Sequence, residues 1–206
     1  MESLISFLLL FPIFMVAVVV HEVSHGWAAL VLGDRTALIA GRLTLNPFKH
    51  TDLIGTIVLP ITLLVVRSPF VFGWAKPVPV NVMNLRHPKR DMLWVGAAGP
   101  TANFILAVLA ALFLRCVGPS VPSLVVAGTK YLILINLVLG VFNLIPIPPL
   151  DGSRILTGLL PLRLAREMLS LERWGVILVM LLLALGFLNR ILHPAVAFLA
   201  RLLGVS

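Results

Sequence analysis

The sequence predicts an all-α polytopic membrane protein, a bundle of about four to five transmembrane helices. Of its 206 residues, 60% are hydrophobic and only 12% are charged, and the mean hydropathy is +1.08. Several apolar runs approach or exceed the roughly 20 residues that a helix needs to cross a bilayer. We expect a single membrane-embedded domain over residues 1–206, because a bundle of this size leaves no room for a second globular domain.

The net charge of +8 would suit a nucleic acid partner in a soluble protein. In a membrane protein, Lys and Arg concentrate instead in cytoplasmic loops, so the charge indicates topology and we expect no nucleic acid partner. The one cysteine, Cys116, excludes an internal disulfide. No basic segment precedes the first apolar run, so we do not expect a signal peptide.

The first apolar segment predicts a helix over about residues 4–32, which the turn pair Gly33-Asp34 ends. Near its end stands His21-Glu22-Val23-Ser24-His25, the H-E-x-x-H arrangement of zinc hydrolases. Histidines four residues apart lie on one face of a helix, where both can bind one metal ion, and Glu22 can reach a water on that metal. A helix end whose polar side chains meet water is the alternative. Ionisable groups within a membrane segment are costly, however, which favours a functional site.

Two unusual segments follow before the next long helix. Residues 53–66 are apolar but short for a span and are broken by Pro60, which leaves a full span and a re-entrant segment as alternatives. Residues 72–81 are rich in proline and alternate apolar with small or polar residues, which predicts a short extended or β element. A proline-rich surface loop is the alternative for this second segment.

Residues 92–114 and 131–145 predict the next two long helices. The first carries Gly99-Pro100-Thr101-Ala102-Asn103, whose small residues let a neighbouring helix approach closely. The second ends in the run from Asn143 to Gly152, where three prolines within four positions cannot continue a helix. The chain must therefore unwind near membrane depth, and Asp151 lies in this unwound tip.

The C-terminal helices are expected within residues 153–206. Residues 153–173 are amphipathic and basic, as in a segment at the membrane interface. Residues 174–188 predict one more membrane helix, and a last amphipathic piece follows His193-Pro194.

A zinc site needs a third protein ligand and an open position for water. Beyond the two motif histidines, the candidate ligands are Asp151, Asp52, His50, His87, His193 and Asp91. If residues 53–66 cross the membrane, Asp151 ends on the face opposite Gly33 and cannot reach the histidines. If they are re-entrant, residues 34–91 all stay on one side, and the third long helix delivers Asp151 to the depth of His25.

The distribution of basic residues favours the re-entrant arrangement. It places twelve of the 16 Lys and Arg residues on one side, as the positive-inside rule requires of a cytoplasmic face, whereas a full span divides them far more evenly. We therefore expect the N-terminus outside and the metal site in the cytoplasmic half of the membrane. His21, His25 and Asp151 then form the ligand set.

Three segments in order resemble the signature segments of the site-2 protease family of intramembrane zinc metalloproteases: His21 to His25, Gly99 to Asn103 and Asn143 to Gly152. The resemblance covers about residues 15–155 and is to the compact branch without a PDZ domain. It implies one Zn²⁺ ion per chain, held by His21, His25 and Asp151, with Glu22 as the catalytic acid/base. It also implies a transmembrane protein substrate, cleaved in or near its membrane segment within the lipid bilayer of a prokaryotic cell membrane.

Three further features carry alternatives. Asn103 either donates to a substrate carbonyl or developing oxyanion, or makes an interhelical hydrogen bond. Asn143 either satisfies backbone groups freed by the prolines or, as the lesser alternative, contacts substrate. Residues 72–81 offer a strand edge that could hold an unwound substrate by β-addition.

Two other functions compete with proteolysis. A membrane scaffold without activity would be expected to have lost one of the site residues, and the set is complete. A metal transporter would need ligands across the whole membrane, whereas the sequence shows one cluster on one side.

Overall fold

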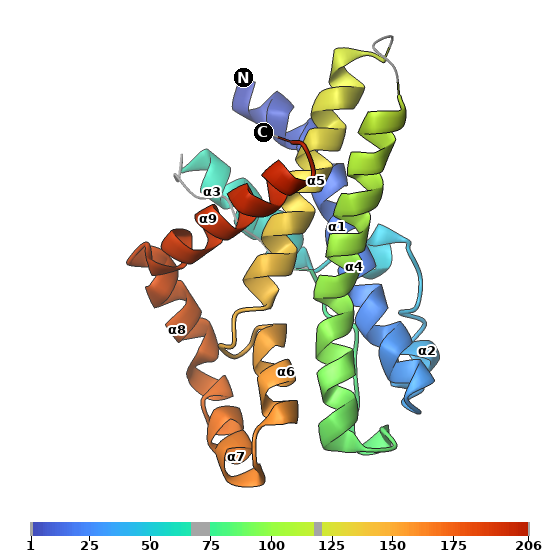
Figure 1. Ribbon diagram of the computed structural model, residues 1–206, viewed down its shortest axis with the longest axis vertical. Coiled ribbons are helices and arrows are strands. Elements are labelled where there is room, and N and C mark those ends of the chain that lie inside the picture. The colour runs from blue at the N-terminus through green and yellow to red at the C-terminus, as the bar shows by residue number, and fades with distance from the viewer. Residues whose placement is uncertain (1, 67–74, 118–120, 206) are drawn as a thin grey trace.

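The computed structural model describes residues 2–66, 75–117 and 121–205, and every regular element within those ranges is helical (Figure 1). Three helices are long and apolar enough to cross a membrane: α1 (Glu2–Val31), through its part Leu10–Val31, α4 (Pro88–Cys116) and α5 (Ser123–Asn143). The protein is therefore an all-α polytopic membrane protein. The described residues hold three such helices, fewer than the four to five expected.

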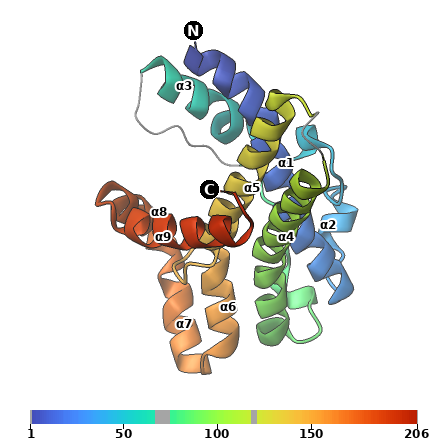
Figure 2. The same ribbon diagram turned by 45° about the horizontal axis from the view of Figure 1, so that its top comes forward.

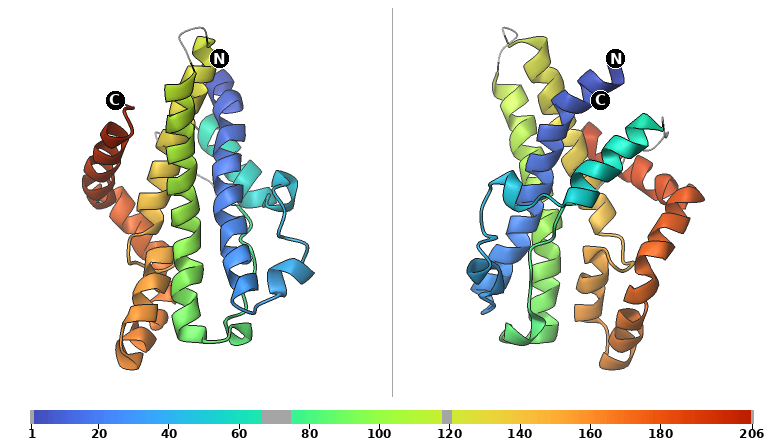
Figure 3. Two further views of the ribbon diagram at one scale, coloured as in Figure 1. Left: turned by 45° about the vertical axis from the view of Figure 1, so that its right-hand side comes forward. Right: turned by 180° about the vertical axis from the view of Figure 1, so that it is seen from behind.

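Helix α4 is the centre of the bundle, since it packs against α1, α5 and α6 (Asp151–Leu159). The chain direction reverses between α1 and α4, which lie side by side in the left view of Figure 3. Helix α4 also packs closely against α5, where Ala107, Ala110 and Ala111 of α4 are buried with Ile133 and Leu137 of α5. The close approach predicted for the segment from Gly99 to Asn103 is found against α1, since a Cβ on Gly99 would lie 2.6 Å from Cε1 of His21.

The helix expected over residues 174–188 corresponds to α8 (Glu172–Ala184), which is not among the helices long enough to span a membrane. The expected amphipathic segments on either side of it form α6 and α7 (Leu162–Ser170) and α9 (Phe187–Leu202), which begins earlier than the predicted last piece after Pro194. Gly186 separates α8 from α9 with a φ of 68°, a left-handed conformation that glycine adopts readily. Helix α9 folds back onto α5, and α6 and α7 run side by side next to α4 (Figure 2).

The segment between α1 and α4 leaves the bundle and returns to its starting point. It holds α2 (Thr36–Ile39), η1 (Pro47–Lys49), a π-helix (Leu53–Val58), α3 (Leu59–Val65) and η3 (Val82–Asn84). The backbone N–H of Lys76 donates to the carbonyl of His50 at 2.8 Å, so both ends of the excursion meet. The right view of Figure 3 shows α3 pointing away from that meeting point. This geometry supports the re-entrant arrangement over a full span.

The expected extended element at residues 72–81 lies partly outside the described residues. Residues 75–81 run beside α1 and α4 without regular structure (Figure 3), so no β-strand is present in this part. Pro77 and Pro79 explain this, because proline lacks the N–H that a sheet ladder needs.

Candidate metal centre

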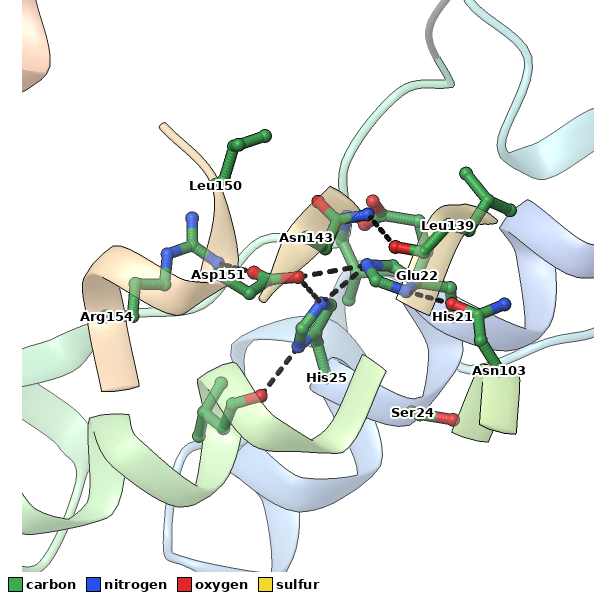
Figure 4. A network of polar contacts seen from close by, with 12 residues as sticks. His21, Glu22, Ser24, His25, Asn103, Leu139, Asn143, Leu150, Asp151 and Arg154 are labelled. Carbon is green, nitrogen blue, oxygen red and sulfur yellow. Dashed lines mark hydrogen bonds and ion pairs between the residues drawn. The ribbon is translucent and has the colours of Figure 1, made fainter. Parts of the chain in front are cut away.

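The motif of α1 brings two imidazoles together on the face that packs against α4. His21 and His25 are both buried, and their Nε2 atoms lie 3.1 Å apart. One helical turn separates the two residues, which is why the rings meet. Figure 4 shows both rings pointing toward Asp151, which comes from a different part of the chain.

Asp151 reaches the histidines because the chain turns sharply after α5. Its Oδ2 atom lies 3.1 Å from Nε2 of His21 and 3.1 Å from Nε2 of His25. The prolines end α5, and Gly152 permits the tight turn, since a Cβ there would lie 2.5 Å from the carbonyl oxygen of Ile145. Asp151 is the first residue of α6, not part of an irregular tip as the sequence suggested.

Both histidines direct their unprotonated nitrogen at the site. Nδ1 of His21 lies 2.6 Å from Oδ1 of Asn103, and Nδ1 of His25 lies 2.6 Å from the carbonyl oxygen of Val95. These oxygens only accept hydrogen bonds, so each Nδ1 must donate and carry the ring proton. In the neutral form of each ring, Nε2 then presents a lone pair toward Asp151, the arrangement that hydrogen-bonded metal ligands adopt.

This donor set fits a cation. Three acceptor atoms, two Nε2 and one carboxylate oxygen, lie within 4.8 Å of one another and are buried. Ligands at about 2.1 Å from a tetrahedral zinc ion stand roughly 3.4 Å apart, near the 3.1 Å found here. Gly99 leaves the space open, because a Cβ there would lie 2.6 Å from Cε1 of His21 and would collide with Nε2 of His25.

Asn103 lies deep between helices. Its side chain is completely buried and accepts from His21, while its Nδ2 donates to the carbonyl of Ala17 at 3.2 Å and to Oδ1 of Asn136 at 2.7 Å. The carbonyl of Ala17 can only accept, which fixes the orientation of the amide. Both ends of Asn103 are thus in use, which favours the interhelical alternative over contact with substrate.

Glu22 faces a cavity of about 760 Å³ that also reaches His21, His25 and Asp151. Its Oε2 atom accepts from the backbone N–H of Val78 at 2.8 Å. Residues 76–81, which include Val78 and are called the wall segment below, therefore run along one side of the cavity. Helices α6 and α7 line the other side.

Asn143 also lines this cavity, and its Nδ2 donates to the carbonyl of Leu139 one turn earlier at 3.0 Å. The carbonyl of Leu139 lies within α5, so Asn143 does not satisfy a backbone group that the prolines free.

The other candidate ligands lie outside this cluster. His50 is buried in its own loop, where Nε2 bonds to the carbonyl of Thr44 at 2.8 Å. Asp91 accepts from the backbone N–H of His87 at the start of α4. Within the described part of the chain, His21, His25 and Asp151 are the one group of three or more His, Cys, Asp or Glu residues that could hold a metal ion.

A second buried carboxylate, Asp34, anchors the wall segment beyond the end of α1. It accepts from the N–H and the hydroxyl of Thr36, from the side chain of Asn84 and from the N–H of Asn81. Burial alone would raise the pKa of Asp34, but these hydrogen bonds outweigh it and hold the pKa below its ordinary value.

These features define a polytopic membrane protein with a buried His/Asp cluster that could hold a metal ion, beside a cavity lined by Glu22. Residues 118–187 match Peptidase family M50. YwhC of Bacillus subtilis is 36% identical over 186 residues, which are 87% of this chain and 81% of that protein. Rip2 of Mycolicibacterium smegmatis is 30% identical over 200 residues, which are 97% of this chain and 76% of that protein.

A relative from Methanocaldococcus jannaschii is 27% identical over 160 residues, which are 78% of this chain and 37% of that protein. The names of all three relatives include the words zinc metalloprotease. No solved structure matches the chain. The chain belongs to Peptidase family M50, the site-2 protease family, and is a membrane zinc metalloprotease with Zn²⁺ as its cofactor.

Sequence reasoning missed four parts of the site: Asn136, Arg154, the Val95 carbonyl and the Val78 N–H. Asn136 had a signal, because a polar residue inside an uncharged span usually faces the bundle interior. Arg154 follows Asp151 by three residues, a spacing that brings side chains together once both are on a helix. The two backbone groups had no signal, since any residue supplies them.

Proposed function

We propose that this protein hydrolyses peptide bonds in or near transmembrane segments of membrane proteins, as a step of regulated intramembrane proteolysis. One Zn²⁺ is held by His21, His25 and Asp151, and Glu22 is the catalytic acid/base. The carrying observation is the convergence of two imidazole Nε2 atoms and one carboxylate oxygen, 3.1 Å apart, from helices α1 and α6. Three such atoms repel one another unless a cation lies among them.

When bound, zinc polarises the scissile carbonyl and lowers the pKa of water toward neutrality. Glu22 takes the proton of the attacking water and delivers it to the leaving amide nitrogen. The hydrogen bond from Val78 holds Oε2 of Glu22 and leaves Oε1 for this transfer. Asp151 would offset part of the charge of the bound metal, and the Nδ1 partners of the buried histidines would keep both Nε2 atoms directed at it.

The wall segment is suited to hold an extended substrate. Val78, which stands between Pro77 and Pro79, and Val80 both line the cavity. Within the described residues, no backbone N–H donates to the carbonyls of residues 77–80. A substrate helix must unwind before attack, and an extended backbone could then pair with these free carbonyls by β-addition. Asn143 lines the same cavity and is a further candidate contact for the substrate.

The orientation in the membrane is part of the proposal. The hydrogen bond between Lys76 and His50 joins the two ends of the excursion, and the re-entrant arrangement then puts twelve of the 16 Lys and Arg residues on one side of the membrane. By the positive-inside rule this side is the cytoplasmic one, so the catalytic centre lies in the cytoplasmic half of a prokaryotic cell membrane.

The test uses purified protein in lipid vesicles with a panel of tagged single-span membrane proteins as probes. We expect wild type to release fragments whose new termini, mapped by mass spectrometry, lie within or beside the span. Glu22→Gln should lower the cleavage rate by about 100-fold or more while zinc content stays at the wild-type value. Glu167→Gln, which removes an exposed carboxylate outside the cavity, is the matched control. Undiminished cleavage by Glu22→Gln would refute the role of Glu22, and cleavage only of soluble segments would refute the intramembrane site.

A further inference from the structure

The carboxylate of Asp151 has different neighbours on its two oxygens. Oδ2 faces both histidines at 3.1 Å. Oδ1 accepts a hydrogen bond from the guanidinium of Arg154 at 3.3 Å, as Figure 4 shows. Both residues belong to the first turn of α6, and the spacing of three places their side chains on the same face.

We propose that Arg154 is a positioning residue that holds Oδ1 of Asp151 away from the metal, so that Asp151 binds zinc through Oδ2 alone. The inference rests on the zinc ligand set of the proposed function. Arg154 would hold the second carboxylate oxygen of Asp151, which neither the other ligands nor Glu22 contacts.

The location of Arg154 is set by backbone packing. Its Cβ lies over Gly96 of α4, where a glycine Cβ would come within 3.0 Å of it. This close approach of α4 and α6 fixes the origin of the arginine side chain beside Asp151. No other residue in the described ranges donates a hydrogen bond to Oδ1 of Asp151, so its position depends on Arg154.

The arrangement has a chemical consequence. A carboxylate can bind a metal ion through one oxygen or through both. A catalytic zinc site needs three protein ligands and an open fourth position, and a second oxygen from Asp151 would compete for that position. Arg154 occupies Oδ1 with a charge-assisted hydrogen bond and keeps the position open. Its side chain is 41% exposed, so solvent screens the ion pair and its main effect is on geometry.

Cobalt substitution tests this inference without relying on activity. Tetrahedral Co²⁺ absorbs visible light more strongly than Co²⁺ with five or six ligands. We expect wild type loaded with Co²⁺ to show the strong absorption, and Arg154→Met to show a weaker one, with affinity for Co²⁺ lowered about 10-fold. Arg154→Lys keeps one donor and should recover most of the wild-type spectrum. Arg163→Met, which changes an exposed arginine outside the cavity, should leave the spectrum unchanged.

The outcomes separate the inference from the proposed function. A wild-type protein that binds no Co²⁺ would contradict the metal site itself. A wild-type protein that binds Co²⁺, with a spectrum and affinity unchanged by Arg154→Met, would overturn only the role of Arg154. If Arg154→Met loses Co²⁺ entirely, Arg154→Lys decides: recovery of the strong absorption supports the inference, and equal loss in a folded Lys variant overturns it.

Discussion

The buried interior of the metal centre and the outer wall of its cavity are held in different ways. In the interior, two groups of α4 accept hydrogen bonds from the histidines: the carbonyl of Val95 from His25, and the amide oxygen of Asn103 from His21. Wall residues 76–81 are instead attached through three backbone N–H groups, to the His50 carbonyl, Glu22 and Asp34. This contrast suggests that the interior fixes the ligands, while the wall can change its hold on substrate without disturbing them.

The largest effect on the interior should come from Gly99→Ala. The new Cβ would occupy the space between the imidazoles, so zinc content should fall to near zero. Gly128→Ala is the control, because it is also a helical glycine and its Cβ would meet Ile13 only at 3.5 Å. Metal analysis after dialysis measures both. A Gly99→Ala protein with wild-type zinc content would contradict the described packing of α1 against α4.

The asparagine pair should show a graded effect. Asn103→Leu removes the acceptor for His21 and should weaken zinc binding about 10- to 100-fold. Asn136→Leu should weaken it less, because Asn136 acts on His21 only through Asn103. Competition with a chelator of known affinity gives both values. The reverse order would show that the orientation of His21 does not depend on this network.

Changes to the wall should leave zinc content intact. Asp34→Ala removes the acceptor for Asn81 and Asn84, so amide hydrogen exchange should quicken across residues 78–84 and substrate cleavage should slow. Glu167→Ala, at an exposed position, should change neither. Loss of zinc in Asp34→Ala would mean that wall and interior are one cooperative unit.

The smallest expected effect is the pH dependence of the stability that Asp34 contributes to the wall segment. The pKa of Asp34 is lower in the folded protein than in the unfolded chain, so its contribution is fully present above the ordinary pKa of about 4 and is lost as pH falls below it. The difference in melting temperature between wild type and Asp34→Ala should therefore be constant near neutral pH and shrink in acid. A difference that shrank as pH rose would have the wrong sign.

The sequence predicted that His21, His25 and Asp151 come together, because spacing and topology constrain their positions strongly. Two histidines four residues apart lie on one face of any helix. The distribution of Lys and Arg residues favoured the topology that brings Asp151 to the same side of the membrane as these histidines. The sequence predicted that a helix ends at about residue 188, close to the break at Gly186, but it did not predict that α9 begins at Phe187 and continues through Pro194. It also could not predict that Val78 holds Glu22, since that bond uses a backbone N–H.

Zinc content of wild type and of Asp151→Ala tests the central claim most directly, since Asp151 joins α6 to the motif of α1. Wild type should carry about one zinc ion per chain, and Asp151→Ala should lose most of it. Glu22→Gln should keep its zinc and so control for the loss of a nearby carboxylate. If Asp151→Ala binds zinc as tightly as wild type, Asp151 is not a ligand, and the convergence of α1 and α6 on one metal ion would be contradicted.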